Sequence, residues 1–312
     1  MPIQLLPDKV SGRNAVYMVD GNIGRKGKFG GVATASSSSG ERVTIKRVDK
    51  HIDEVLAVVE RLALIDRPDI APVVDVAQQD GALFIVRKMI EGTDIKSIFA
   101  DKKVYGKIDE DNWIKIGLAV LDALSALHSA GIVHRDIKPS NIVLRHSPGQ
   151  DLIHADFSAI SIIDFEQSSV VGSQTARTAF SLIYSPPEMV LKHSDLVGPQ
   201  ADLFALATTI YHLVMGKTPY NDCNPEVLIN LQLTYPFQKP GRMTQQLFDV
   251  LAHAAYKQAF RLPPRRLSAD EIADTLRRGV EGRYSSADEM RAALASVDHA
   301  LLPASWWQKV FN

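Results

Sequence analysis

The sequence predicts an α+β fold with two lobes, a small β-rich N-terminal lobe and a larger helical C-terminal lobe. The chain has 312 residues, which is enough to bury the cores of two packed lobes. Strand-like segments around one helix occupy residues 1–91, and helix-like periodicity begins after Gly92. We therefore expect a single domain made of lobes at 1–91 and 92–300, followed by an apolar tail at 301–312.

The N-terminal lobe is expected to be a mostly antiparallel sheet interrupted by one helix. Its clearest turn is the serine-rich segment 36–40, which ends in glycine and separates two strand-like runs. The elements that follow are one helix and two strands, expected near 52–65, 73–74 and 83–86. A hinge between the lobes is expected near residues 88–92.

The C-terminal lobe is expected to be built on two buried helices. Apolar residues recur at spacings of three and four from Ile114 to Leu127, which predicts a helix with a wide buried face. Gly131 is expected to end this helix. Residues 202–215 are apolar nearly all round, so this segment should form a central helix that stops at Gly216.

Composition and charge exclude several classes of protein. Hydrophobic residues make up 46% and charged residues 23%, which are ordinary values for a globular protein. The 36 acidic and 35 basic residues nearly cancel, so no nucleic-acid partner is expected. The single cysteine, Cys223, permits no internal disulfide, which is typical of a cytoplasmic protein. No apolar run is long enough for a transmembrane segment, and the oligomeric state stays open.

The strongest chemical signal is the segment 134–141, which reads His-Arg-Asp-Ile-Lys-Pro-Ser-Asn. Three of its side chains suit phosphoryl transfer. Asp136 can accept the proton of an incoming hydroxyl, Lys138 can neutralise a γ-phosphate, and Asn141 can hold a metal ion. The alternative is a polar turn before the strand-like run 142–144.

This segment resembles the catalytic loop of the eukaryotic-like (Hanks-type) Ser/Thr protein kinase family. A lysine two positions after the aspartate resembles the Ser/Thr branch, and the compact form resembles bacterial members. Other family landmarks follow in order over residues 16–294. The resemblance implies a bilobal protein-kinase-like fold, ATP and Mg²⁺ as cofactors, and a protein substrate.

The resemblance also implies which residues bind ATP. Lys46, in a Val-Thr-Ile-Lys strand, would grip the α- and β-phosphates and count among the catalytic residues. Residues 27–32 resemble the second half of a glycine-rich phosphate loop, although Gly24 stands one position too early. The full ATP-binding set is Gly24, Gly27, Gly30, Val32, Lys46 and the hinge residues Lys88 and Ile90.

Two aspartates are candidates for the second metal ligand. Asp164 ends an apolar run as the family's Asp-Phe-Gly does, but with Glu166 in place of glycine. Asp156 is an equally short match, and it lies at a more usual separation from Asn141. Asp164 is the preferred candidate because Ile160 and Ile162 alternate as in a buried strand.

Four residues are expected to hold the site together. Glu188, in Tyr-Ser-Pro-Pro-Glu, resembles the glutamate that the family pairs with a late arginine, for which Arg283 fits. Asp202 would brace the catalytic loop from beneath. Glu54 is the preferred partner of Lys46, with Glu60 as the alternative.

The segment after Glu166 is expected to be regulatory. Arg135 would pair with a phosphate added to Thr175 or Thr178 by autophosphorylation, and Ser181 would shape the substrate cleft. Any flexible loop is also rich in Ser and Thr. The apolar tail is expected to pack on the helical lobe, with docking to a partner or a membrane surface as the alternative.

We therefore expect a Ser/Thr protein kinase that transfers the γ-phosphate of ATP to a protein hydroxyl. Two other functions stay open. The irregular glycine loop and the missing glycine after Phe165 fit a pseudokinase scaffold, and Asp-Phe-Glu also occurs in choline-kinase-like small-molecule phosphotransferases. The surviving Lys46, Asp136 and Asn141 favour catalysis over the first. The Tyr-Ser-Pro-Pro-Glu segment and Asp202 favour a protein substrate over the second.

Overall fold

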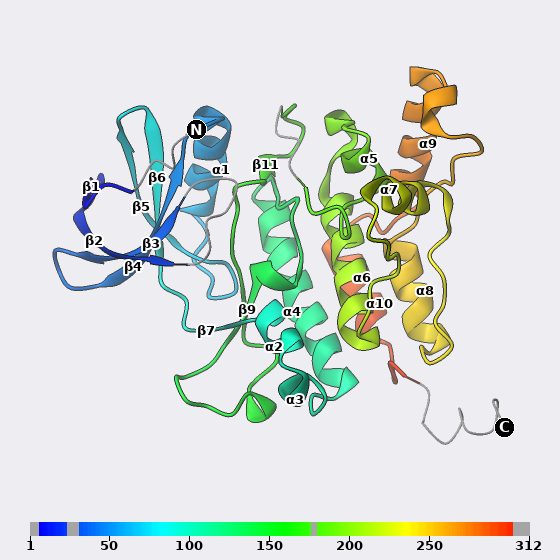
Figure 1. Cartoon of the computed structure of the whole chain (residues 1–312), viewed down its shortest axis with the longest axis horizontal. Coiled ribbons are helices and arrows are strands. Elements are labelled where there is room, and N and C mark those ends of the chain that lie inside the picture. The colour runs from blue at the N-terminus through cyan, green and yellow to red at the C-terminus, as the bar shows by residue number, and fades with distance from the viewer. Residues whose placement is uncertain (1–5, 24–30, 176–179, 302–312) are drawn as a thin grey trace. The chain divides into compact units, whose positions relative to one another are not determined.

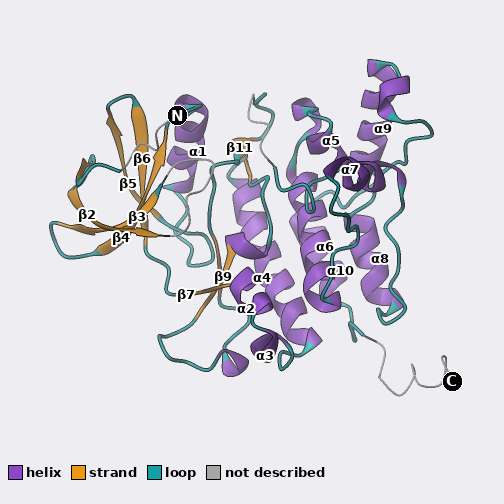
Figure 2. Cartoon of the chain, viewed as in Figure 1, coloured by secondary structure: helices purple, strands orange, loops and turns teal. Residues whose placement is uncertain are grey.

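A computed structural model describes residues 6–23, 31–175 and 180–301 of the chain. The chain divides into two compact units at residue 91, Met1–Glu91 and Gly92–Asn312. Strands dominate the first unit and helices the second (Figure 2). The predicted α+β fold, β-rich in its N-terminal region and helical in its C-terminal region, is therefore confirmed.

The first unit is built on a six-stranded antiparallel sheet in the order β1-β2-β3-β4-β6-β5 (Figure 1). The predicted hairpin turn joins β3 to β4, with Gly40 at a φ of 84°. That left-handed backbone costs glycine little, because it has no Cβ. The strands are β1 (Lys9–Ser11), β2 (Val16–Ile23), β3 (Val32–Ser37), β4 (Arg42–Val48), β5 (Val73–Gln79) and β6 (Ala82–Lys88).

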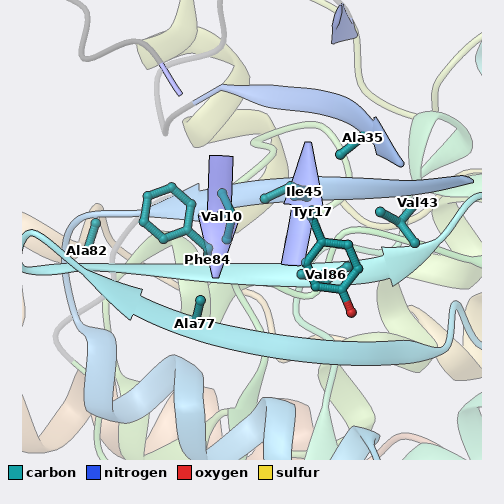
Figure 3. Close-up of a cluster of buried hydrophobic side chains, with 9 residues drawn as sticks. All are labelled: Val10, Tyr17, Ala35, Val43, Ile45, Ala77, Ala82, Phe84 and Val86. Carbon is teal, nitrogen blue, oxygen red and sulfur yellow. The ribbon is translucent and has the colours of Figure 1, made fainter. Parts of the chain in front are cut away.

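The two faces of this sheet carry separate apolar clusters. One cluster gathers around Phe84 and Tyr17 (Figure 3). On the other face, Leu83 and Ile85 pack against Val55 and Val59 of helix α1 (Ile52–Leu62). Alternation along β6 places successive side chains on opposite faces, so both faces of this strand are buried. Helix α1 ends three residues before the predicted position.

Asp75, in β5, holds the connection between β1 and β2 through hydrogen bonds. Its buried carboxylate accepts hydrogen bonds from the backbone N–H groups of Arg13 (2.9 Å), Asn14 (2.8 Å) and Ala15 (3.2 Å) and from the Tyr17 hydroxyl (3.1 Å). Burial by itself raises the pKa of Asp75, but the backbone hydrogen bonds outweigh burial and hold that pKa below its usual value. No local pattern in the sequence predicts this contact.

The second unit contains two small sheets. The first has the order β10-β9-β7, and the second pairs β11 with β8. All of these pairings are antiparallel. The strands are β7 (Gly92–Asp94), β8 (Ile132–Val133), β9 (Ile142–Arg145), β10 (Ile160–Ile162) and β11 (Ser169–Val170).

Helices form the body of the second unit, and α4, α6, α8 and α10 pack side by side (Figure 1). As predicted, α4 stops just before Gly131 and α6 stops at Gly216, both glycines having a φ near 72°. The helices are α2 (Ile95–Ala100), α3 (Lys102–Tyr105), α4 (Glu110–Ser129), α5 (Pro187–Val190), α6 (Pro199–Met215), α7 (Pro225–Thr234), α8 (Gln245–Ala254), α9 (Ala269–Glu281) and α10 (Ala287–Ala295). The short 3₁₀ turns of the described residues are η1 (Pro139–Asn141), η2 (Leu152–His154), η3 (Ser194–Leu196) and η4 (Pro264–Arg266).

Only the first residue of the predicted tail, Leu301, is described, and it forms a bridge with Met243. The tail's expected packing therefore lies outside the described residues. Within the described ranges, none of the helices has both the length and the apolar character needed to cross a membrane.

Candidate active site

The predicted catalytic loop is held by one buried carboxylate from α6. Asp202 is fully buried and accepts the backbone N–H of His134 at 2.8 Å and that of Arg135 at 2.7 Å. The ring Nε2 of His128, at the end of α4, lies 2.9 Å from the same carboxylate. Arg135 has a φ of 67°, a conformation that costs a side-chain-bearing residue free energy. Asp202 thus stabilises a strained turn immediately before Asp136.

His134 links this loop to the segment that follows β10. Its Nε2 donates to the Ile163 carbonyl at 3.1 Å, and its Nδ1 accepts the N–H of Asp136 at 3.3 Å. Burial lowers the pKa of His134, which agrees with a neutral ring that donates from one nitrogen and accepts at the other. The ring also meets Phe165 edge to face, with centroids 4.9 Å apart.

Three polar side chains converge on the Asp136 carboxylate. Lys138 Nζ lies 2.6 Å from Oδ2, and Asn141 Nδ2 lies 3.0 Å from the same oxygen. Ser181 Oγ donates to Oδ1 at 2.8 Å and accepts from Lys138 Nζ at 2.8 Å. Ser181 is 43 positions from Lys138 and 45 from Asp136 in the sequence, yet the three side chains form one hydrogen-bonded cluster. Asp136 is 9% exposed, so its carboxylate is nearly enclosed by these partners.

The register of two strands decides which aspartate lies beside Asn141. Ile162 of β10 pairs with Ile142 of β9, and the Ile163 N–H donates to the Asn141 carbonyl at 2.9 Å. The residue after Ile163 is Asp164, so Asp164 leaves the strand at the same end as Asn141. In an antiparallel pair, a residue before β10 lies toward the opposite end of the hairpin.

Asp156 is such a residue, and the structure does not bring it to Asn141. It is exposed, and its Oδ1 accepts the N–H of Ser158 at 2.9 Å and the Ser158 hydroxyl at 2.6 Å. The hydroxyl hydrogen bond is the main cause that lowers the pKa of Asp156. Asp156 caps its own turn, a common local role for aspartate. Of the two candidates, only Asp164 lies at the same end of the β9–β10 pair as Asn141.

The substitution of Glu166 for glycine does not strain the backbone at that position. Among the described residues, the left-handed conformation in this segment occurs two positions earlier, at Asp164, where φ is 63°. A side chain is therefore tolerated at 166, and the conformational cost falls on Asp164 instead.

Glu188 and Arg283 form the predicted ion pair. The guanidinium contacts both carboxylate oxygens, at 2.6 and 2.9 Å, and both side chains are 1% exposed. Arg283 also donates from Nε to the Tyr256 carbonyl at 2.9 Å and covers the ring of Phe204. The pair therefore joins α5 to the connections on either side of α9.

In the first unit, the antiparallel register places two predicted ATP-binding residues opposite each other. Val32 of β3 pairs with Lys46 of β4, and Lys46 pairs in turn with Ile85 of β6. Ile85 belongs to the apolar cluster that packs on α1. Paired residues point to the same face of a sheet, so Lys46 lies on the face that carries α1. Lys88 ends β6, and Ile90 is half-buried just beyond it.

The two candidate glutamates on α1 differ in their surroundings. Glu60 is more than half exposed and lies 3.9 Å from Arg13. Glu54 is half-buried and lies 3.2 Å from His51 Nδ1. The more enclosed Glu54 stays the preferred partner of Lys46.

Several predicted residues lie outside the described part of the chain, namely Gly24, Gly27, Gly30 and Thr178. Thr175 is the last described residue before the second gap. Two residues that support the loop were not predicted from the sequence. His128 contacts Asp202, and Ser168 donates its buried hydroxyl to the His134 carbonyl at 3.2 Å. Neither stands in a pattern that would single it out in advance.

Comparisons with known proteins agree with this geometry. The protein kinase domain profile matches residues 17–274, well over half of the chain. The chain is 27% identical to sperm motility kinase 3A of Mus musculus over 252 residues, covering 78% of this chain and 46% of that protein. It is 32% identical to serine/threonine-protein kinase PknF of Mycobacterium tuberculosis over 169 residues, covering 54% and 34%.

A third relative is the SNF-related serine/threonine-protein kinase of Homo sapiens, 26% identical over 266 residues, with 82% of this chain and 32% of that protein covered. The chain thus spans less than half the length of these curated relatives. The catalytic loop, the Asp-Phe segment and Glu188 all lie within residues 17–274, and Arg283 lies just beyond that range. On this evidence of sequence and geometry together, the chain belongs to the protein kinase family.

Proposed function

We propose that this chain is a serine/threonine protein kinase that transfers the γ-phosphate of ATP to a Ser or Thr hydroxyl of a protein substrate. One observation carries the proposal: Lys138, Asn141 and Ser181 converge on the Asp136 carboxylate within hydrogen-bonding distance. A carboxylate held in this way is fixed in direction before the acceptor arrives, which favours in-line attack.

Asp136 and Lys138 would divide the work of the transfer. Asp136 orients the acceptor hydroxyl and takes its proton, while the acceptor oxygen bonds to the γ-phosphorus and the bond to the ADP oxygen breaks. Lys138 Nζ, 2.6 Å from that carboxylate, brings a positive charge to the transferring phosphoryl group. Ser181 keeps the two groups together by bonding to both.

The residues beside Asp136 suit a magnesium ion. Asn141 Nδ2 donates to the Asp136 carbonyl at 2.8 Å and to its Oδ2 at 3.0 Å, while the amide oxygen accepts only a long hydrogen bond from the Ser140 hydroxyl, at 3.3 Å, among the described residues. That oxygen and the Asp164 carboxylate are the hard oxygen ligands that Mg²⁺ prefers. When bound, Mg²⁺ would neutralise charge on the phosphate oxygens.

Within the first unit, Lys46 is proposed to contact the α- and β-phosphates, with Glu54 holding its ammonium group. Val32, opposite Lys46 in the sheet, would contact the adenosine moiety together with the hinge residues Lys88 and Ile90. The glycine-rich residues Gly24, Gly27 and Gly30 would cover the phosphates.

Autophosphorylation at Thr175 or Thr178 is proposed to order the segment before Ser181. Arg135 would supply the positive charge, since it stands next to Asp136 and is 6% exposed. A free, exposed thiol at Cys223 supports a reducing, cytoplasmic location.

The test is phosphate transfer from radiolabelled ATP to a generic basic protein with Mg²⁺ present. Wild type should label the protein, and Asp136→Asn should lose at least about 100-fold in rate because the general base is gone. Asp156→Asn is the matched control, because Asp156 is exposed and caps only its own turn. Equal labelling by wild type and Asp136→Asn would overturn the mechanism, and no labelling by wild type would favour a pseudokinase scaffold. Labelling of small alcohols in preference to protein would favour a small-molecule phosphotransferase.

A further inference from the structure

Helix α7 ends beside the segment that carries Ser181. Gln232, in its last turn, is 1% exposed, and its side-chain Nε2 donates to the backbone carbonyl of Leu182. Leu182 directly follows Ser181, whose hydroxyl bridges Asp136 and Lys138. A buried side chain from one helix therefore holds the peptide next to the cluster on the Asp136 carboxylate.

The peptide before Leu182 is already held by a turn of its own. The Ser181 carbonyl accepts the N–H of Tyr184 at 2.9 Å, the N–H of Ser185 at 3.1 Å and the Ser185 hydroxyl at 3.0 Å. The Leu182 carbonyl is the next acceptor along the chain, and Gln232 Nε2 donates to it. Together the turn and Gln232 fix two successive peptide planes, which leaves Ser181 Oγ little freedom to leave Asp136.

The backbone of Gln232 is itself anchored by Lys257. Lys257 Nζ donates to the Gln232 carbonyl and, at 3.4 Å, to the Leu231 carbonyl, and it lies 4.3 Å from the centroid of the Tyr220 ring. The last carbonyls of a helix have no partner within the helix, so the amine of Lys257 supplies hydrogen bonds that they otherwise lack. Its neighbour Tyr256 is held through its carbonyl by Arg283 at 2.9 Å. The end of α7 is thereby tied to the Glu188–Arg283 pair.

The choice of an amide at 232 has a cost that an apolar residue would avoid. The Gln232 Oε1 atom is buried and has no hydrogen-bond partner among the described residues. Leaving a buried acceptor unpaired destabilises the folded protein. Methionine would fill a similar volume without that cost. The useful atom at this position is therefore the Nε2 donor that reaches Leu182.

We propose that Gln232 is a positioning residue for the phosphoryl-acceptor site, holding the Leu182 peptide so that Ser181 stays on Asp136 and Lys138. It acts through Ser181 and touches no reacting atom. The inference rests on the proposed kinase function and adds to it a residue from α7 that couples this helix to the catalytic carboxylate.

The test compares Gln232→Met and Gln232→Glu with wild type. Gln232→Met lacks any donor, and Gln232→Glu keeps the shape of the side chain but lacks a donor while it is ionised. Using a Ser-containing peptide and ATP with Mg²⁺, we expect kcat/KM for the peptide to fall by about 10-fold, while KM for ATP stays within about two-fold. Amide hydrogen exchange in residues 180–185 should speed up in both variants. Gln245→Met is the matched control, since Gln245 is exposed on α8 and bonds only Asp249 in its side-chain contacts.

Two results would overturn the inference alone. One is an active wild type with unchanged peptide kinetics and unchanged exchange at 180–185 in both variants. The other is a fall in kcat/KM for the peptide that comes with an equally large rise in KM for ATP and a lower melting temperature. That result would mean general destabilisation. A wild type that labels no peptide would instead refute the proposed function, and with it any positioning role in transfer.

Discussion

Arg283 contacts both carboxylate oxygens of Glu188, at 2.6 and 2.9 Å, across a sequence separation of 95 residues. Both side chains are 1% exposed, so the pair is shielded from water. A bidentate arginine–carboxylate pair has fixed geometry as well as charge. Removing one member leaves the other charge buried without compensation, which costs more than the pair itself contributes.

For this pair we expect Arg283→Met to lower the free energy of unfolding by about 3–5 kcal/mol. Glu188→Gln should cost a similar amount, and the double variant should cost clearly less than the sum of the two. Urea unfolding of all four proteins, followed by circular dichroism, measures this. Additive losses would mean that the two side chains stabilise the protein independently.

Asp202→Asn is expected to destabilise the loop before Asp136. The amide oxygen can still accept one N–H, but the NH₂ group would face the other, so one of the buried N–H groups of His134 and Arg135 would lose its acceptor. We expect a loss of about 2–3 kcal/mol in stability and a larger relative loss of transfer activity, because Arg135 would relax from its φ of 67°. Unfolding and kinetic measurements on the same variant check this. Full activity in the folded variant would contradict the bracing role.

Gly12→Ala is expected to disrupt the hydrogen bonds between Asp75 and the backbone of residues 13–15. A Cβ built on Gly12 would lie 2.1 Å from Asp75 Oδ2, a distance that real Cβ atoms do not show. We expect a loss of roughly 2 kcal/mol or more in stability from this overlap. Asp75→Ala removes the atom that the new Cβ overlaps. Gly12→Ala should therefore cost less stability in the Asp75→Ala background than in wild type, and Asp75→Ala should likewise cost less in the Gly12→Ala background. Equal costs in both backgrounds would place the strain elsewhere.

The buried amine of Lys257 is expected to make the free energy of unfolding depend on pH. Burial, assisted by the charge of Arg283, lowers the pKa of Lys257 from 10.5 to about 7. Between these two values the unfolded chain holds a proton that the folded chain has released, so stability rises with pH by up to about 1.4 kcal/mol per unit. Below pH 7 both states are charged, and the cost of the buried charge is fully present.

Urea unfolding at about pH 6, 8 and 9.5 would reveal this slope. Lys257→Met should remove it, leaving a flatter profile than wild type. Lys103→Met is a suitable control, since Lys103 is exposed. Parallel profiles for wild type and Lys257→Met would show that the ammonium group is not penalised by burial.

Magnesium dependence separates the two metal candidates. Asp164→Ala should weaken Mg²⁺-dependent ATP binding by at least about 10-fold, because it removes a carboxylate ligand beside Asn141. Asp156→Ala should bind as wild type does, and removal of Mg²⁺ with a chelator should bring wild type to the level of Asp164→Ala. Calorimetric titration with ATP measures all three. Loss of Mg²⁺-dependent binding only in Asp156→Ala would reverse the assignment.

Much of the fold followed from local patterns. The 3.6-residue periodicity before Gly131 and the glycines at 131 and 216 predicted where two helices lie and end. The serine-rich hairpin was equally visible. The α1 helix was predicted three residues too long, because apolar residues near Ile65 continue the pattern while the chain turns at Ala63.

By itself, the sequence determined the fold class, the protein kinase family and the residues of the segment 134–141, because these depend on local periodicity and on short motifs. Only the tertiary structure decided that Asp164 rather than Asp156 lies beside Asn141, and that Gln232 reaches Leu182. Strand register and side-chain burial set these contacts. Both depend on packing between segments far apart in the chain, which no local pattern specifies.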